Sequence, residues 1–107
     1  MNTSRGDAQT VSATQLVVTD DTLTVDLSDG RSIAVPLAWY PRLQHGTAEE
    51  RGRWRLIGQG RGIHWPDLDE DISVGSLLAG RTSAESPQSF MRWREGRANA
   101  ETPPQTA

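Results

Sequence analysis

The chain has 107 residues, no cysteine, and 11 basic residues, all arginine, against 14 acidic residues, for a net charge of -3. A chain of this length forms one domain with a small core, and without cysteine it has neither disulfides nor thiolate metal sites. The net charge disfavours nucleic acid, whose binders usually carry a basic excess. The sequence shows no signal peptide and no apolar run near the roughly 20 residues that cross a bilayer. We therefore expect a cytoplasmic protein that does not span a membrane.

Three strands are predicted in the first third of the chain. Residues 16–19 are apolar or β-branched, and apolar and polar side chains alternate over residues 22–27 and again over residues 33–37. Asp20-Asp21 and Ser28-Asp29-Gly30 supply turns between them. Consecutive strands joined by short turns predict an antiparallel meander.

Short helices and a further strand follow. Residues 38–43 are expected to form a helical turn that lays Trp39 and Tyr40 on the sheet. Thr47 and Glu50 have the capping-box spacing, which predicts that a second helix begins after Thr47. Residues 58–62 carry glycine at every second position and predict the turn of another hairpin, leading into a strand over residues 63–65.

Two helices are predicted in the last third. Ser73 is a candidate N-cap for a helix over residues 74–79, which Gly80 closes. Ser86 followed by proline predicts a last helix that runs to about Arg97.

The predicted fold class is therefore α+β, an antiparallel β-meander with additional strands after the second helix and a sheet packed by short helices. Residues 1–12 are expected to form a disordered leader and residues 13–81 a single α+β domain. Residues 82–98 would be a C-terminal helical extension and residues 99–107 a disordered tail, because both ends are too polar to bury enough surface to offset ordering.

A resemblance to a known family rests on residues 29–31, 35–43 and 85–87, and above all on Gly62-Ile63-His64-Trp65-Pro66-Asp67-Leu68-Asp69-Glu70-Asp71-Ile72. These residues resemble domain-of-unknown-function family 2442, and the resemblance covers roughly residues 15–97. It implies a small bacterial α+β protein, often encoded beside a second small protein in a toxin-antitoxin-like pair, with no known activity. The signature residues, expected to be structural, are Trp39, Tyr40, His64, Trp65, Pro66, Asp67, Asp69, Glu70 and Asp71.

The sequence departs from the family pattern at two positions. Gly75 stands where a helix former is more usual, and Arg94 stands where leucine is more usual. Both departures are expected to weaken the C-terminal helices or their docking.

Catalytic and metal sites are not predicted. His64 with the acids that follow it matches neither the zinc spacings nor the calcium loop, and we expect Asp69 or Asp71 to cap turn donors. Residues 58–62 join strand to strand, whereas phosphate loops lead into a helix. No nucleophile elbow is present, and His45 and His64 are the only histidine bases. We expect neither an enzyme nor a cofactor.

Two functions remain as hypotheses. The first is a protein-interaction module, an antitoxin-like partner of another small protein, which would use an edge strand or a C-terminal surface made of Phe90, Trp93 and Arg94. The second is a nucleic-acid-binding or regulatory module that would use the basic cluster Arg51, Arg53, Arg55 and Arg61. The low net charge favours the first. The oligomeric state stays open, a homo-oligomer included.

Overall fold

The computed structural model describes residues 11–101, which form two three-stranded antiparallel sheets with short helices. The first sheet has the order β1-β2-β3, with β1 Ala13–Val18, β2 Thr22–Leu27 and β3 Ser32–Pro36. The second has the order β4-β5-β6, with β4 Arg55–Ile57, β5 Gly62–Trp65 and β6 Glu70–Ser73. The α+β class and the meander are confirmed. The later strands, however, form a sheet of their own instead of joining the meander.

No strand is predicted over residues 70–73, because Glu70 and Asp71 are acidic and interrupt the apolar pattern. In the structure Glu70 and Ile72 are half-buried and buried, whereas Asp71 and Ser73 are exposed. This is the period of two of a strand with one covered face. The pairing Ile63 to Ile72 aligns it with β5.

The helices follow the predicted capping signals. They are the 3-10 turn η1 Leu37–Trp39 and the helices α2 Pro41–His45, α3 Ala48–Gly52, α4 Val74–Ala79 and α5 Pro87–Glu101. The Thr47 hydroxyl accepts the Glu50 N–H at 3.1 Å, and the Glu50 carboxylate accepts the Thr47 N–H at 2.9 Å. Ser73 caps α4 and Gly80 ends it with φ of 73°. The helical turn expected over residues 38–43 is interrupted at Tyr40, since a residue before proline disfavours helical backbone.

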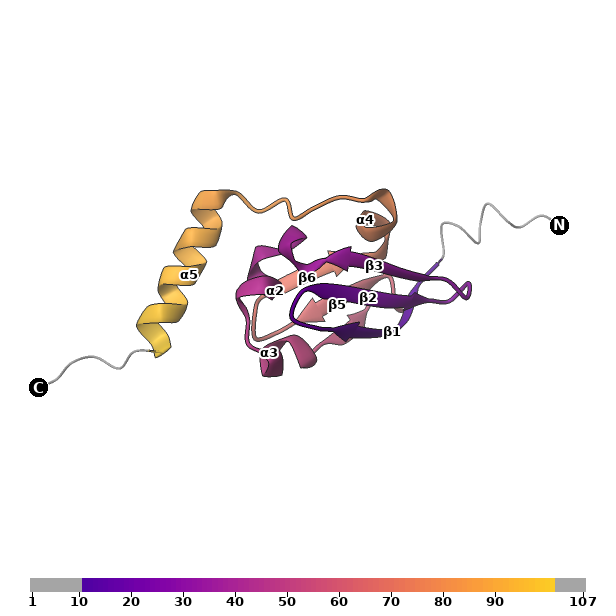
Figure 1. Ribbon diagram of the computed structural model, residues 1–107, viewed down its shortest axis with the longest axis horizontal. Coiled ribbons are helices and arrows are strands. Elements are labelled where there is room, and N and C mark those ends of the chain that lie inside the picture. The colour runs from indigo at the N-terminus through magenta and orange to yellow at the C-terminus, as the bar shows by residue number, and fades with distance from the viewer. Residues whose placement is uncertain (1–10, 102–107) are drawn as a thin grey trace, which may run out of the picture.

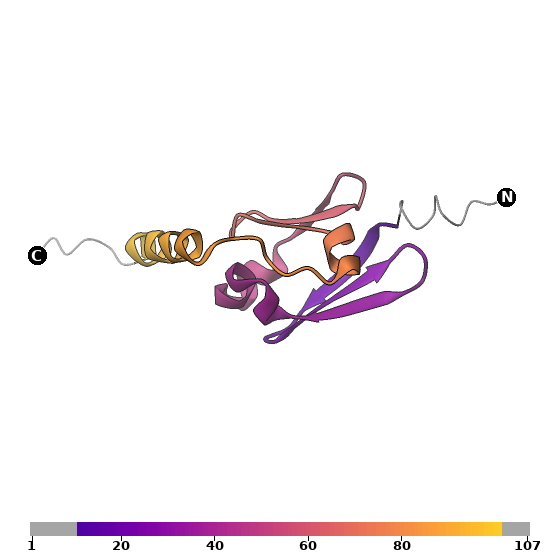
Figure 2. The ribbon, with the colours of Figure 1, turned by 90° about the horizontal axis from the view of Figure 1, so that it is seen from above.

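One core joins the two sheets. Figures 1 and 2 show them as two layers, with α4 at one end and α5 at the other. Trp65 is fully buried, and its indole N–H donates to the Arg51 carbonyl at 3.0 Å. The other three tryptophans are only half-buried at the margin of the core: Trp39, Trp54 and Trp93. A β-bulge between Ala13 and Gln15 lets both Ala13 and Leu16 face inward.

The ends of the described chain differ from the expected domain boundaries. Val11 is buried and the Ser12 N–H donates to the Ser28 hydroxyl at 3.0 Å, so the packed domain includes two residues assigned to the leader. At the other end, α5 continues to Glu101, beyond the expected end at Arg97. The rest of the predicted leader, residues 1–10, and of the predicted tail, residues 102–107, lies outside the described residues. Within residues 11–101, none of the helices has the length and apolar character that crossing a bilayer requires.

The turn between β4 and β5 contacts the first sheet through Gly60. Its carbonyl accepts the Ala13 N–H at 2.7 Å, its φ is 86°, and a Cβ added there would lie 2.8 Å from the Ala13 carbonyl oxygen. Residues 58–61 therefore join strand to strand, as predicted, and the glycine allows the two sheets to meet.

Replacing Gly60 by alanine should lower the free energy of unfolding by about 3 kcal/mol, because strain at positive φ adds to a backbone clash. Gly30→Ala is the matched control. Its φ is 93° but a Cβ would meet nothing within 4 Å, so only the strain of about 1 kcal/mol is expected. Urea denaturation of both variants measures the difference, and equal losses would contradict a tight contact at Gly60.

Candidate functional site

A cleft of about 560 Å³ lies between strand β6 and the extended segment of residues 81–85. The carboxylates of Asp69, Glu70 and Glu85 line it together with Arg42, the buried Tyr40 and several serines. The wall opposite β6 is fixed to the domain, because the Ser83 N–H donates to the Trp39 carbonyl at 3.0 Å and the Tyr40 hydroxyl donates to the Arg81 carbonyl at 3.0 Å. The cleft is therefore built largely in advance of any ligand.

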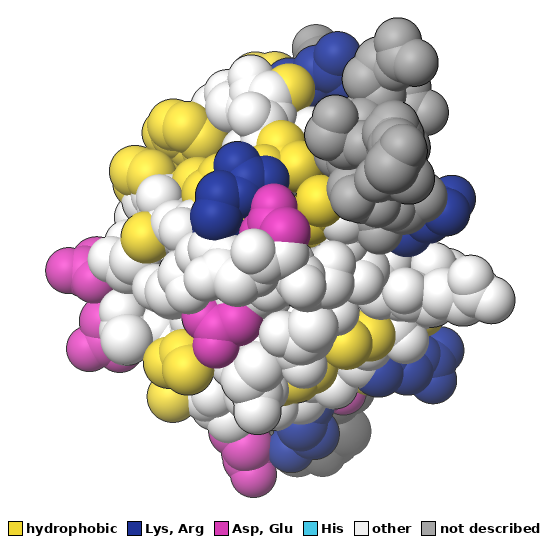
Figure 3. All heavy atoms as spheres, turned by 90° about the vertical axis from the view of Figure 1, so that its right-hand side faces the viewer, with side chains coloured by type: hydrophobic (Ala, Val, Ile, Leu, Met, Phe, Trp, Pro, Cys, Tyr) yellow, Lys and Arg dark blue, Asp and Glu magenta, His cyan; other side chains and the backbone are white. Residues whose placement is uncertain are grey.

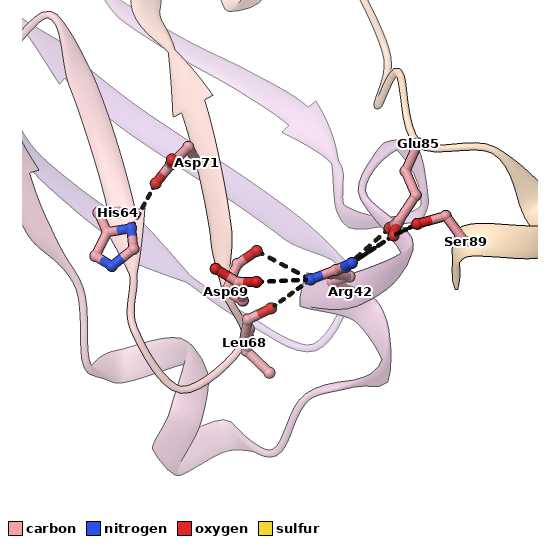
Figure 4. Close-up of polar contacts among 7 residues, drawn as sticks. All are labelled: Arg42, His64, Leu68, Asp69, Asp71, Glu85 and Ser89. Carbon is pink, nitrogen blue, oxygen red and sulfur yellow. Dashed lines mark hydrogen bonds and ion pairs between the residues drawn. The ribbon is translucent and has the colours of Figure 1, made fainter. Parts of the chain in front are cut away.

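Arg42 holds the cleft together from helix α2 (Figure 4). Its guanidinium donates to the Glu85 carboxylate at 2.5 to 3.1 Å and to the carbonyls of Leu68 at 3.3 Å and Asp69 at 3.0 Å. The hydrogen bond from Arg42 is the main cause that lowers the pKa of Glu85 and raises that of Arg42. Through these hydrogen bonds, Arg42 joins α2, the β5–β6 turn and residues 81–85. Its side chain is only 14% exposed, so these contacts are largely shielded from water.

Glu70 is the acid of the cleft whose pKa is raised. Burial raises its pKa to about 7, against the attraction of Arg42, while the negative charges of Glu85 and Asp71 add to the rise. Burial, followed by the charge of Glu70, likewise raises the pKa of Tyr40. Within residues 11–101, no ion pair involves Glu70.

The outer edge of β6 faces the cleft. The Val74 N–H donates to the Arg61 carbonyl at 2.9 Å. In an antiparallel pair every second residue bonds to the neighbouring strand, so Ile72 and Glu70 direct their backbone groups toward β5. Asp71 and Ser73 therefore direct their backbone N–H and C=O groups away from β5. In the part of the chain that the structure describes, no strand pairs with this edge.

The remaining signature residues make structural contacts. Nδ1 of His64 lies 2.5 Å from an Asp71 carboxylate oxygen, and Arg53 donates to Asp67 at 2.5 Å. Asp69 has positive φ and occupies the turn, where its carbonyl accepts a hydrogen bond from Arg42 and its carboxylate lies 3.6 Å from the same guanidinium. Within the described residues, neither the Asp69 nor the Asp71 carboxylate accepts a hydrogen bond from a backbone N–H of the turn, so the expectation that one of them caps the turn is wrong. Pro66 is exposed beside the buried Trp65, and among the described residues no group of three or more His, Asp or Glu is placed to hold a metal.

Two of the four residues in the predicted basic cluster make contacts within the domain. Arg51 donates to the carbonyls of Leu43 at 3.0 Å and Gly46 at 2.8 Å, and its side chain is only 12% exposed. Arg53 pairs with Asp67. Arg53, Arg55 and Arg61 are all exposed, and the Arg53 side chain is 54% exposed despite its ion pair. On the face drawn in Figure 3, basic side chains are scattered among acidic and uncharged ones and form no continuous patch.

The predicted partner surface on α5 packs against its own domain in part. The guanidinium groups of Arg42 and Arg97 contact the face of the Trp93 ring, 5.0 and 4.9 Å from its centre. Phe90 stacks on Trp93 at 5.7 Å, and both rings make T-shaped contacts with His45. Of the three predicted residues, only Arg94 is exposed.

A second ion pair anchors the same helix. Arg97 donates to Glu50 at 2.9 and 3.0 Å, and this hydrogen bond is the main cause that lowers the pKa of Glu50 to about 2. The sequence reasoning did not find Arg42, Glu85 or Arg97 as contact residues. The only local signal was that Arg42 and Glu85 lie within residues 35–43 and 85–87, two of the stretches that carry the family resemblance.

The fold and the cleft define a small α+β protein of two three-stranded sheets, with an open strand edge beside a polar cleft. Residues 13–83 match the model of a family described as protein of unknown function (DUF2442). The chain belongs to this family, as its sequence motifs predicted.

Two solved structures are similar to it. A protein of unknown function from Rhodospirillum rubrum has 27% identity and a TM-score of 0.61, over 70% of this chain and 93% of that one. An uncharacterized protein from Chromobacterium violaceum has 17% identity and a TM-score of 0.63, over 82% of this chain and 81% of that one, which supports the fold alone. A search of curated proteins finds no match.

Replacing Glu70 by glutamine should make stability less dependent on pH. The folded-state pKa of Glu70, about 7, exceeds the ordinary value of 4.5. The contribution of Glu70 to the free energy of unfolding is therefore complete below pH 4.5 and is lost as pH rises through 7. The variant should therefore gain on the order of 2 kcal/mol over wild type at pH 8 and nothing at pH 4. Urea denaturation across this range measures the gain. The exposed Glu95→Gln is the control, and a gain independent of pH would contradict the burial of Glu70.

Replacing Trp93 by alanine should lower the free energy of unfolding by about 2 kcal/mol, because two cation–π contacts and packing on the core are lost. Met91→Ala on the same helix, where the side chain is 53% exposed, should change stability by less than about 0.5 kcal/mol. Thermal denaturation of both variants tests this. Unchanged stability in Trp93→Ala would contradict packing of Trp93 on its own domain and would support its predicted role in a partner surface.

Proposed function

We propose that this protein is a non-catalytic protein-interaction module that receives an extended segment of a small partner protein in the cleft beside β6. The observation that carries the proposal is the open edge of β6 at Asp71 and Ser73, which lines the cleft. An unpaired strand edge presents donors and acceptors that an added strand can satisfy, and side-chain pockets beside it give specificity. The fixed wall of residues 81–85 favours binding, because little ordering is required on the protein's side.

The contacts of the cleft support a role without catalysis. Its serine hydroxyls have structural partners: Ser73 and Ser76 bond to each other at the start of α4, Ser83 accepts the Glu85 N–H, and Ser89 donates to the Glu85 carboxylate. Neither histidine lines the cleft. Glu70 could exchange a proton near neutrality, but a hydrolytic or transfer reaction also needs an activated nucleophile aligned with it.

The family resemblance supports a small protein as the partner, in an antitoxin-like pair whose genes lie side by side. Nucleic acid is the second candidate, supported by the exposed Arg55 and Arg61. It ranks lower because Arg51 and Arg53 are held by carbonyls and a carboxylate of the domain, and because the net charge is -3.

A photo-crosslinking residue placed at Ala84, which is exposed and lines the cleft, tests the proposal in the native host. The same residue at the exposed Ala34 of β3 is the matched control. We expect one small protein, identified by mass spectrometry and encoded beside this one, to be captured from position 84 and not from position 34. The same products from both positions would overturn the proposal. Captured DNA that is lost in an Arg55→Ala, Arg61→Ala variant would favour the second candidate.

A further inference from the structure

Resting on the proposed function, we infer that the bound segment carries an arginine or lysine side chain, which enters the cleft and pairs with Glu70. The inference names the chemistry of the occupant: an extended segment, basic at the position that faces Glu70. It follows from comparing the carboxylates of the cleft and finding which one lacks both a cationic partner and full exposure to water.

The other carboxylates of the cleft are either paired with a cation or exposed to water. Glu85 is bound by Arg42, and Asp71, whose side chain is 67% exposed to water, contacts His64. Asp69 lies 3.6 Å from Arg42 and its side chain is 88% exposed, so water solvates it well. Glu70 differs from these three, because it is half-buried and has no ion-pair partner within residues 11–101. It is the carboxylate of the cleft that a new cation would stabilise most.

The groups that face Glu70 also select for a cation. Arg42 from α2 attracts it, but that guanidinium is engaged by Glu85 and two carbonyls. Glu85 from the opposite wall and Asp71 from the same strand repel it. An acidic residue of a partner would enter this negative field at a cost, whereas a basic one would relieve the repulsion and offset the burial of the carboxylate.

The register of β6 places this contact. Glu70 and Ile72 share the covered face of the strand, while the backbone groups directed away from β5 belong to Asp71 and Ser73. In a sheet, side chains on the same face of neighbouring strands lie opposite each other within contact distance. The residue of an added strand that lies opposite Glu70 on this face therefore decides whether the carboxylate is neutralised.

The test uses the peptide Thr-Val-Arg-Val-Thr, with blocked ends, titrated into the full-length ¹⁵N-labelled protein at pH 8. We expect saturable NMR shifts at the amides of Asp71 and Ser73. Affinity should be roughly three- to tenfold lower for Thr-Val-Gln-Val-Thr, because it cannot form the ion pair. The preference for arginine should disappear in Glu70→Gln and persist in Glu95→Gln, which removes the same charge from an exposed site on α5. Equal affinities of the two peptides for wild type, or no shifts at β6, would overturn the inference.

A pH titration of the same binding separates Glu70 from its neighbours. Affinity for the arginine peptide should fall as pH drops from 8 to 6, because protonation removes the charge of Glu70. His64 and Asp71 lie on the adjacent strands, and any contribution from them remains in Glu70→Gln, so the difference between the two proteins reports Glu70 alone. An identical pH dependence in both proteins would contradict the inference. A partner captured from position 84 together with no preference for arginine would leave the proposed function standing and remove only the ion pair.

Discussion

The fork of hydrogen bonds from Arg42 is the interaction on which the rest of the structure depends. One guanidinium reaches the turn before β6, the segment after α4 and the indole of Trp93, which come from three separate parts of the chain. A planar group with five donors can serve several acceptors at once, which an ammonium group does less well. The cleft has its shape because both of its walls are bonded to this side chain.

Features that depend on neighbouring residues could be predicted from the sequence. The alternation over residues 22–27, the Thr47–Glu50 capping box and the Ser73 cap are local, and all three occur in the structure. The hairpin turn at residues 58–62 was predicted, but the separate second sheet was not, because strand pairing partners are not specified by local pattern and the acidic residues of β6 obscure its alternation. The pair of Arg42 and Glu85 joins residues 43 positions apart, and no local pattern signals such a contact.

The candidate sites show the same division. The arginines at 51 and 53 lie close together in the sequence and suggested a basic surface, yet one is turned inward onto carbonyls and the other pairs with Asp67. The acidic signature suggested turn capping, yet its members separate into ion pairs, a turn residue and the half-buried Glu70. A sequence gives the residue types, but burial and partners decide which charges remain available, and these depend on how the two sheets pack.

Glu50 takes part in both a local and a distant contact, since its carboxylate accepts the Thr47 N–H that begins α3 and also the guanidinium of Arg97 near the end of α5. Undocking of α5 would leave this carboxylate without its cation, and unwinding of the first turn of α3 would move the acceptor that holds α5. The two helices are thus expected to open and close as one cooperative unit, although 47 residues separate the paired side chains along the chain.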